Sequence, residues 1–237
     1  QVQDLCNFLI LCGVKISGVG SSILEIEGES KLTSKTYSLL PDHYEIATFI
    51  ALGAATKGEV KVKNAQASFF KPIWRVFERF GIKLDLDGED LILAPNQNVR
   101  IQADERGTLF IKAQPWPSLP VDLLPIFIPL SLASSTGQVV FHNWMYDAGL
   151  FWTTELQKMG ANIIIADPHR VVVIAGNKLY GATLEAPYII RAVVAMVMTA
   201  MIAEGETTIL NADALYRGHP RFAENLKALG AKIEEVS

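Results

Sequence analysis

The segment Gly58-Glu59-Val60-Lys61-Val62-Lys63-Asn64 ends an apolar, alanine-rich run and begins a short stretch of alternating charged and apolar residues. The same combination, a glycine after an apolar run and an asparagine six residues later, returns at Gly137 to Asn143 and at Gly205 to Asn211. Each copy is followed by a second marker, an apolar residue before a glycine: Phe80-Gly81, Met159-Gly160 and Leu229-Gly230. Self-similarity of this kind indicates one folding unit used repeatedly, and a period of about 70–80 residues is too long for a solenoid repeat. The sequence therefore predicts three small α+β units.

One unit is predicted to have the order β-α-β-α-β-β, with one helix that is apolar all round and one that is apolar on a single face. In the first unit the hairpin signal is Asp87-Gly88, which separates two apolar strands. We expect the elements of this unit in the following order: a short strand before Pro41, a buried helix over 44–56, a strand over 59–63, a surface helix over 69–80 and a hairpin over 82–93.

The second and third units repeat this arrangement, with buried helices predicted over 119–134 and 189–203. Pro125 and Pro129 lie inside the first of these helices, and an interior proline removes a hydrogen bond at a cost of about 3 kcal/mol. A late start or a kink is therefore expected there. The second unit also has a strand over 139–141, a surface helix over 150–159 and a hairpin over 162–175. The third unit has a surface helix over 222–229. Three such units can pack their apolar helices together and cover them with sheets, which predicts an α+β fold of the inside-out prism type.

The composition limits the partners and the location. Lysine and arginine number 21 against 25 aspartate and glutamate, so the net charge of −4 argues against a nucleic-acid-binding face. The most apolar stretch, 192–203, is shorter than the roughly 20 residues that a membrane span needs. Cys6 and Cys12 are too few for a secreted disulfide framework, which predicts a cytoplasmic protein. The four histidines lack metal-ligand spacing, so no metal site is expected.

Several long motifs follow one another in the order that a known family shows. They are 4–9 (DLCNFL), 13–18 (GVKISG), 40–42 (LPD), 115–123 (PWPSLPVDL), 156–161 (LQKMGA), 202–208 (IAEGETT), 217–218 (RG) and 226–231 (LKALGA). These residues resemble the enolpyruvyl transferase family, and within it the branch that acts on UDP-N-acetylglucosamine more than the 5-enolpyruvylshikimate-3-phosphate synthases.

The resemblance runs end to end and implies two lobes of three repeats, with the active site between the lobes. On that map residues 1–34 are the truncated end of the first lobe and 35–237 are the second lobe, with repeats at about 35–111, 112–176 and 177–237. The chain begins with Gln1 inside an amphipathic pattern, as expected for a piece of a larger polypeptide. The resemblance also implies an incomplete sheet in the second lobe, because an N-terminal segment completes that sheet in the family.

The reaction implied by the resemblance transfers the enolpyruvyl group of phosphoenolpyruvate to the 3-hydroxyl of UDP-N-acetylglucosamine, with release of phosphate and without a cofactor. In the family this is the first committed step of peptidoglycan synthesis. The family's catalytic Cys or Asp loop belongs to the first lobe, and neither Cys6 nor Cys12 matches it. The missing N-terminal lobe is therefore expected to be needed to complete the site.

Four residues match functional positions of the family: Asp122, Met145, Arg191 and Arg217. Asp122 matches an aspartate that contacts the sugar hydroxyl and would act as a base, the alternative being a helix cap. Met145 falls where the family contacts the nucleotide-sugar through its backbone. Arg191 and Arg217 match arginines that hold the phosphoenolpyruvate anion, a task that suits the planar guanidinium fork. The alternative for Arg191 is a side chain that reaches solvent at a helix end, and the alternative for Arg217 is a solvated arginine in a loop.

Two positions depart from the family pattern. The aspartate expected two residues before Arg191 is replaced by Ile189, and an arginine expected near Gly149 is absent. Loss of one positioned acid or base typically costs about 10²–10⁴-fold in rate. The sequence therefore leaves open a degenerate paralogue that binds a nucleotide-sugar without catalysis. It also leaves open a 5-enolpyruvylshikimate-3-phosphate synthase, which fits less well around residues 115–123.

Overall fold

The chain divides into two compact parts, residues 1–42 and the residues from His43 onward. The computed structural model describes residues 1–236. In the first part, helix α1 (Val2–Leu11) is followed by strands β1 (Lys15–Ser17) and β2 (Glu25–Glu27), which pair antiparallel. The predicted domain boundaries stay predictions.

The strand expected before Pro41 does not form, and the prediction of it was wrong. Among the described residues, 28–42 carry no helix or strand. The carboxylate of Asp4 instead accepts hydrogen bonds from Tyr37 Oη at 2.7 Å and from Leu40 N at 3.4 Å. Because the polar groups of this segment are bonded to a side chain of α1 rather than to a neighbouring strand, the first predicted unit lacks its opening strand.

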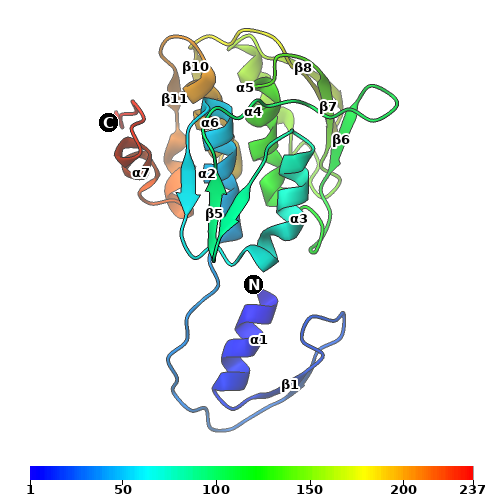
Figure 1. Ribbon diagram of the computed structural model, residues 1–237, viewed down its shortest axis with the longest axis vertical. Coiled ribbons are helices and arrows are strands. Elements are labelled where there is room, and N and C mark those ends of the chain that lie inside the picture. The colour runs from blue at the N-terminus through cyan, green and yellow to red at the C-terminus, as the bar shows by residue number, and fades with distance from the viewer. Residues whose placement is uncertain (237) are drawn as a thin grey trace. The chain divides into compact units, whose positions relative to one another are not determined.

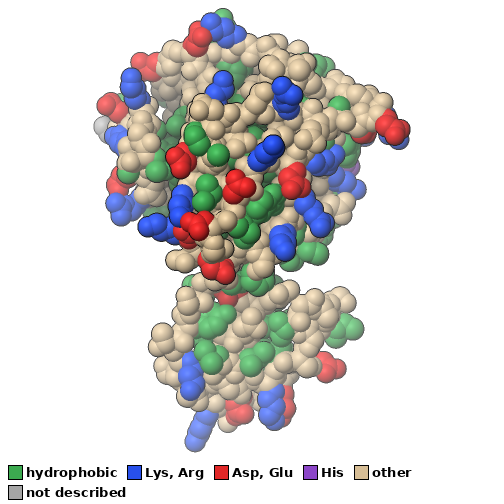
Figure 2. Space-filling view, viewed as in Figure 1, with side chains coloured by type: hydrophobic (Ala, Val, Ile, Leu, Met, Phe, Trp, Pro, Cys, Tyr) green, Lys and Arg blue, Asp and Glu red, His purple; other side chains and the backbone are tan. Residues whose placement is uncertain are grey.

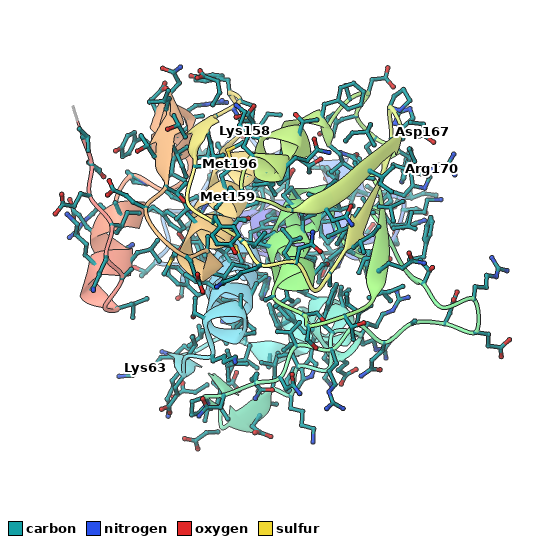
Figure 3. The ribbon with its side chains drawn as sticks, turned by 90° about the horizontal axis from the view of Figure 1, so that it is seen from above. Lys63, Lys158, Met159, Asp167, Arg170 and Met196 are labelled. Atoms are coloured by element: carbon teal, nitrogen blue, oxygen red, sulfur yellow. The ribbon has the colours of Figure 1, made fainter. Side chains whose placement is uncertain are left out.

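Three helices that are buried almost all round form the centre of the second part (Figure 1). They are α2 (His43–Thr56), the continuous pair η1 (Val121–Ile126) and α4 (Phe127–Leu132), and α6 (Ile190–Ile202). Each packs on the other two, and we call them the bundle. Met196 of α6 is fully buried and lies in the interior of the view in Figure 3. Sheets surround the bundle, so the predicted α+β fold with apolar helices inside is confirmed.

Helix α2 lies so close to its sheet that one of its positions has no room for a side chain. A Cβ atom on Gly53 would be 2.4 Å from Cγ2 of Val60 and 2.9 Å from Cδ2 of Leu93. Glycine inside a helix costs about 1 kcal/mol relative to alanine. The apolar contact between helix and strands, worth about 25 cal/mol for each Å² buried, offsets that cost.

The expected effect of proline on the second buried helix is confirmed. The first half, Val121–Ile126, winds as a 3₁₀ helix, and only the second half, Phe127–Leu132, is α-helical. Pro125 has no N–H to donate and its ring crowds the preceding turn, so the tighter winding persists until the chain has passed it.

Three sheets cover the bundle, with the orders β3-β5-β4, β6-β7-β9-β8 and β10-β11. Pairing is parallel between β6 and β7 and between β10 and β11, and antiparallel elsewhere in these sheets. The last sheet has two strands in the described part of the chain, and the expectation that a further segment completes it stays a prediction. The strands are β3 (Val60–Val62), β4 (Asp85–Asp87), β5 (Asp90–Leu93), β6 (Leu109–Lys112), β7 (Gln138–His142), β8 (Asn162–Asp167), β9 (Arg170–Ile174), β10 (Thr183–Glu185) and β11 (Thr208–Leu210).

Two of the predicted surface helices form over nearly the expected residues: α3 (Ala67–Glu78) and α7 (Phe222–Ala228). The helix expected over 150–159 is shorter, with a 3₁₀ turn η2 (Phe151–Thr153) followed by α5 (Thr154–Gln157). The hydroxyls of Thr153 and Thr154 donate to carbonyls three residues back, at 2.7 and 2.8 Å. Bonds with this spacing compete with the α-helical pattern and favour the tighter turn.

Most of the repeated glycines and asparagines of the sequence, although not Gly58 or Asn143, occupy positions of positive φ. Gly81, Gly160 and Gly230 have φ values of 72°, 90° and 97°, the left-handed region that commonly ends a helix. Asn64 and Asn211 have φ values of 51° and 55°, which asparagine tolerates better than most residues. The repeat in the sequence therefore reflects turns that share one backbone requirement.

The surface of the second part mixes both signs of charge on the face shown in Figure 2. At the end of the β8–β9 hairpin, Arg170 pairs with Asp167 at 2.6 Å, and this hydrogen bond lowers the pKa of Asp167 (Figure 3). Within residues 1–236, no helix combines the length and the apolar character that crossing a membrane requires.

Candidate active site

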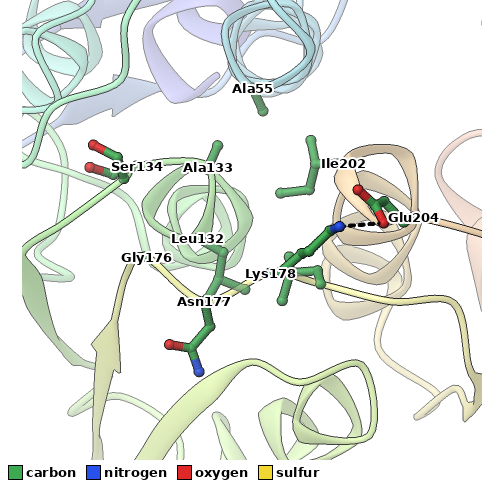
Figure 4. Close-up of a pocket in the computed structure, with 11 residues that line it drawn as sticks. Ala55, Leu132, Ala133, Ser134, Gly176, Asn177, Lys178, Ile202 and Glu204 are labelled. Atoms are coloured by element: carbon green, nitrogen blue, oxygen red, sulfur yellow. Dashed lines mark ion pairs between the residues drawn. The ribbon is translucent and has the colours of Figure 1, made fainter.

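The three helices of the bundle end together. A pocket of about 330 Å³ is lined by Ala55 at the end of α2, Ala133 at the end of α4 and Ile202 at the end of α6 (Figure 4). The helices pack on one another and have similar lengths, 14 residues in α2 and 13 in α6. Since each residue advances a helix by about 1.5 Å, helices that end together also start together. The starts of α2, η1 and α6 therefore meet at the opposite end, which we call the N-terminal end of the bundle.

Arg191 lies in the first turn of α6, at the N-terminal end of the bundle. A helix N-terminus carries a partial positive charge, so this arginine adds positive charge to a site that already favours anions. Its Cζ lies 5.3 Å from the ring centroid of Tyr44, and its Nη1 lies 2.9 Å from Nε2 of His219. The ring and the imidazole orient the guanidinium, and neither carries a formal negative charge that would neutralise it.

His219 connects Arg191 to a carboxylate of helix α2. Its Nδ1 lies 2.8 Å from Oε1 of Glu45, and the residue is 4% exposed. Glu45 lies in the first turn of α2, where the helix dipole favours a carboxylate. Three residues that are far apart in the sequence thus form one connected chain at the N-terminal end of the bundle.

Arg217 is the last residue of η3 (Ala212–Arg217), a 3₁₀ helix that packs on α6. The side chain of Arg217 is exposed, with its Cζ 4.7 Å from the ring centroid of Tyr188. A cation over an aromatic face is attracted by the ring quadrupole, an effect worth about 0.5–1 kcal/mol at exposed sites. Tyr188 therefore orients the second arginine as Tyr44 orients the first.

The segment after Arg217 runs along the start of α6. A Cβ atom on Gly218 would be 3.3 Å from Cδ1 of Ile190, and the next residue, His219, contacts Arg191. The structure therefore brings the two predicted arginines to the same end of the bundle.

Asp122 lies in the first turn of η1 and is exposed. Because η1 packs on α6, Asp122 and Arg191 belong to the same end of the bundle. The N-cap of η1 is Pro120, so Asp122 is not the residue that caps this helix. Among the described residues, no hydrogen bond or ion pair joins Asp122 to either arginine.

Met145 lies in a turn after β7 that Asn143 organises. The buried Asn143 accepts hydrogen bonds at its Oδ1 from the N–H groups of Met145 and Tyr146, both at 3.3 Å. His169 Nδ1 lies 3.0 Å from Asn143 O, which ties the turn to the β8–β9 hairpin. The N–H of Met145 is therefore engaged by Asn143.

The two departures from the family pattern have different structural settings. A Cβ atom on Gly149 would be 2.6 Å from Nδ2 of Asn143 and 3.0 Å from Cβ of Tyr146, so the turn is closed over this position. Ile189 is 44% exposed and is the N-cap of α6, where its side chain offers no acceptor to the helix. A carboxylate would find space at residue 189, whereas an arginine would not fit at residue 149 without rebuilding the turn.

Sequence reasoning missed His219, Glu45, Tyr44 and Tyr188 as parts of this site. A usable signal existed for His219, because a histidine two residues after a predicted ligand-binding arginine is within reach of the same site. Glu45 carried a weaker signal, a carboxylate in the first turn of an apolar helix, which capping alone explains. The packing of α2 against α6 brings Tyr44 and Glu45 to Arg191. The packing of η3 against α6 brings His219 to Arg191 and Arg217 to Tyr188.

The fold and the site define a class of protein. The molecule contains a prism of sheets around buried helices, with two arginines at the N-terminal end of the bundle that are suited to an organic anion. A family model for EPSP synthase (3-phosphoshikimate 1-carboxyvinyltransferase) matches residues 1–226. The chain therefore belongs to the EPSP synthase family, the family of enolpyruvyl transferases.

Individual relatives agree with this assignment. UDP-N-acetylglucosamine 1-carboxyvinyltransferase of Bradyrhizobium diazoefficiens is 39% identical over 237 residues, which cover 100% of this chain and 54% of the relative. The protein of the same name from Bacteroides thetaiotaomicron is 38% identical over 239 residues, covering 99% and 55%. The chain thus spans about half the length of the curated relatives it matches.

Solved structures share the fold. The enolpyruvyl transferase NikO from Streptomyces tendae superposes with a TM-score of 0.83 at 21% identity, over 98% of this chain and 54% of that one. EPSP synthase from Acinetobacter baumannii superposes with a TM-score of 0.70 at 16% identity, over 97% and 54%.

Proposed function

We propose that the chain is the second lobe of an enzyme that transfers the enolpyruvyl group of phosphoenolpyruvate to the 3-hydroxyl of UDP-N-acetylglucosamine. The observation that carries this proposal is the pair Arg191 and Arg217 at the N-terminal end of the bundle, held by aromatic rings and an imidazole. The names of the relatives at 38–39% identity favour UDP-N-acetylglucosamine over shikimate phosphate as the acceptor.

The two arginines would bind the phosphoenolpyruvate anion. Each guanidinium presents several N–H donors in one plane, and hydrogen bonds to a carboxylate or phosphate are about twice as strong as neutral ones. The bundle adds the positive ends of three helices to the same region. Because all of these groups stabilise negative charge, they would also stabilise the phosphate that departs.

Asp122 would accept the proton of the sugar hydroxyl as the hydroxyl oxygen attacks C2 of phosphoenolpyruvate, the carbon that bears the phosphate. A general base has to lie within hydrogen-bond reach of that proton, and the exposed position of Asp122 at the start of η1 leaves it accessible. The backbone of Met145 would contribute a contact to the nucleotide-sugar. The acid that protonates the methylene carbon C3 would come from the lobe that this chain lacks.

The proposed setting is the synthesis of peptidoglycan precursors in the cytoplasm. Both cysteines, Cys6 and Cys12, are free thiols, which suits a reducing compartment.

The test measures phosphate release that depends on both substrates, in the polypeptide that carries both lobes. Asp122→Asn and the pair Arg191→Ala and Arg217→Ala should each lower the rate severely. The 237 residues alone should release no phosphate, because the groups of the other lobe are needed. Phosphate release by the isolated chain, or full activity of the double arginine variant, would refute the proposal.

A second function is favoured by the setting of Ile189 and Gly149: a paralogue that binds the nucleotide-sugar without transfer. Residue 189 has no carboxylate, and the turn is closed at residue 149. Ile189→Asp in the two-lobe protein separates the two functions. A rate that rises about 10²-fold or more would support the second function, because it would show that the chain has lost a catalytic group. A positioned acid or base contributes about that much. An unchanged, substantial rate would eliminate the second function.

A further inference from the structure

His219 is held in place from all sides. Its N–H donates to Leu215 O at 2.8 Å, and its carbonyl accepts from Phe222 N at 3.2 Å. Its ring packs at 5.4 Å from the ring of Phe222 and is almost completely buried. A side chain with this support has little freedom, so the atoms that it presents to Arg191 and Glu45 are fixed.

The two neighbours of the imidazole decide its protonation pattern. Arg191 has only donors and remains charged, so Nε2 at 2.9 Å from its Nη1 has to be the unprotonated acceptor. Nδ1 then carries the proton and donates to Glu45 Oε1 at 2.8 Å. Only one neutral tautomer, with the proton on Nδ1, satisfies both contacts.

We propose that His219 is a positioning residue for Arg191. As a neutral imidazole with its proton on Nδ1, it accepts a hydrogen bond from the guanidinium and connects that guanidinium to the Glu45 carboxylate. The proposal rests on the proposed function only for the identity of the anion that Arg191 binds.

The connection through an imidazole has an advantage over a direct ion pair. A carboxylate in contact with Arg191 would occupy the planar fork that an anionic substrate needs. The imidazole contacts only Nη1 of the guanidinium and lies between Arg191 and the Glu45 carboxylate. Among the described ion pairs, Glu45 pairs with His219 and not with Arg191. Tyr44 lies against the guanidinium as well, so its plane is set before any anion arrives.

The decisive experiment is nitrogen NMR of the 237-residue chain labelled in its histidines. The expected signature for His219 is an unprotonated Nε2 and a protonated Nδ1, assigned by its disappearance in His219→Gln. The control His142→Gln changes a histidine of strand β7 and should leave that signature intact. A protonated Nε2 in His219 would overturn the proposal, because that nitrogen could not accept from Arg191.

Two variants test the consequence for Arg191. His219→Phe keeps an aromatic ring beside Phe222 but removes both nitrogens, so the side-chain N–H groups of Arg191 should exchange with water about 10-fold faster or more. His219→Gln retains a donor and an acceptor and should restore slow exchange. Unchanged exchange in a folded His219→Phe variant would overturn the proposal; if that variant does not fold, the tautomer in the wild-type chain decides.

Binding of phosphoenolpyruvate, measured by titration of the same samples, separates the two proposals. If the chain binds it, His219→Phe should weaken binding by about 10-fold or more, the loss expected for one charged hydrogen bond, and His219→Gln should weaken it less. If the tautomer is as expected and the chain with its missing lobe supplied still does not bind phosphoenolpyruvate, the proposed function fails and the positioning role stands.

Discussion

The two ends of the bundle have the same helices and opposite electrostatic character. At the N-terminal end, Arg191 and Arg217 are held by rings and by a neutral imidazole. At the C-terminal end, Lys178 faces the pocket and pairs with Glu204 at 2.7 Å (Figure 4). The positive charge is left available at one end and is neutralised at the other.

The difference teaches that a charge is informative only together with its partner. Helix starts favour anions and helix ends favour cations. Arg191, at the start of α6, is therefore in an electrostatically unfavourable place unless an anion binds beside it. Lys178 lies near helix ends, which favour a cation, and it also pairs with the carboxylate of Glu204. We infer that the N-terminal end is built to bind an anion and that the C-terminal end is complete by itself.

The largest effect should come from removing both cations at the N-terminal end. Arg191→Ala with Arg217→Ala should lower kcat/KM of the two-lobe protein by about 10⁴-fold, if each arginine contributes one charged hydrogen bond of about 3 kcal/mol. Lys178→Ala is the matched control, because it removes a cation that lines the pocket at the other end of the bundle, and it should leave kcat/KM unchanged. Equal losses from the two changes would show that the ends do not differ in the way proposed.

A smaller loss is expected from Asp122→Asn. The amide keeps the size of the side chain but cannot accept the proton of the sugar hydroxyl, so kcat should fall by about 10²–10⁴-fold. Binding of phosphoenolpyruvate by the same variant should be nearly unchanged, because the proposed function assigns that contact to the arginines. A variant that lost binding but kept kcat would assign Asp122 to substrate binding rather than to proton transfer.

Truncation of the core between the two ends should lower stability rather than change chemistry. Met196 is fully buried in the middle of α6, and Met196→Ala should reduce the free energy of unfolding by about 2–5 kcal/mol through a cavity. Urea unfolding of the chain measures this change. A loss well below that range would mean that the bundle collapses around the missing side chain.

The smallest effect is expected from the ion pair at the C-terminal end. The hydrogen bond and the charge of Glu204 raise the pKa of Lys178, so the pair contributes stability below the ordinary lysine value of 10.5 and loses it as the pH rises through the raised pKa. Both side chains are more than half exposed, so water and salt screen the pair and its contribution to stability is small. The melting temperatures of the wild-type chain and of Lys178→Gln should therefore differ little at neutral pH and converge in strong alkali.

Much of the fold could be predicted because it follows from local chemistry. The apolar run at 44–56, the hairpin around Asp87-Gly88 and the irregular winding near Pro125 all occur where the residues indicate them. The prediction of a strand before Pro41 was wrong. The N–H of Leu40 donates to the side chain of Asp4 instead, and no local sequence pattern reveals that contact. The helix over 150–159 was too long because threonine hydroxyls favour the 3₁₀ turn.

The sequence by itself determined the repeated units, the buried helices and the two arginines that match the anion-binding arginines of the family. Those features depend on neighbours within a few residues or on motifs read along the chain. Only the tertiary structure decided that both arginines meet at one end of the bundle, and that Arg191 reaches Glu45 through His219. The physical reason is that Glu45 and His219 are 174 residues apart, and their atoms reach 2.8 Å only because α2 and η3, the helix before His219, both pack on α6.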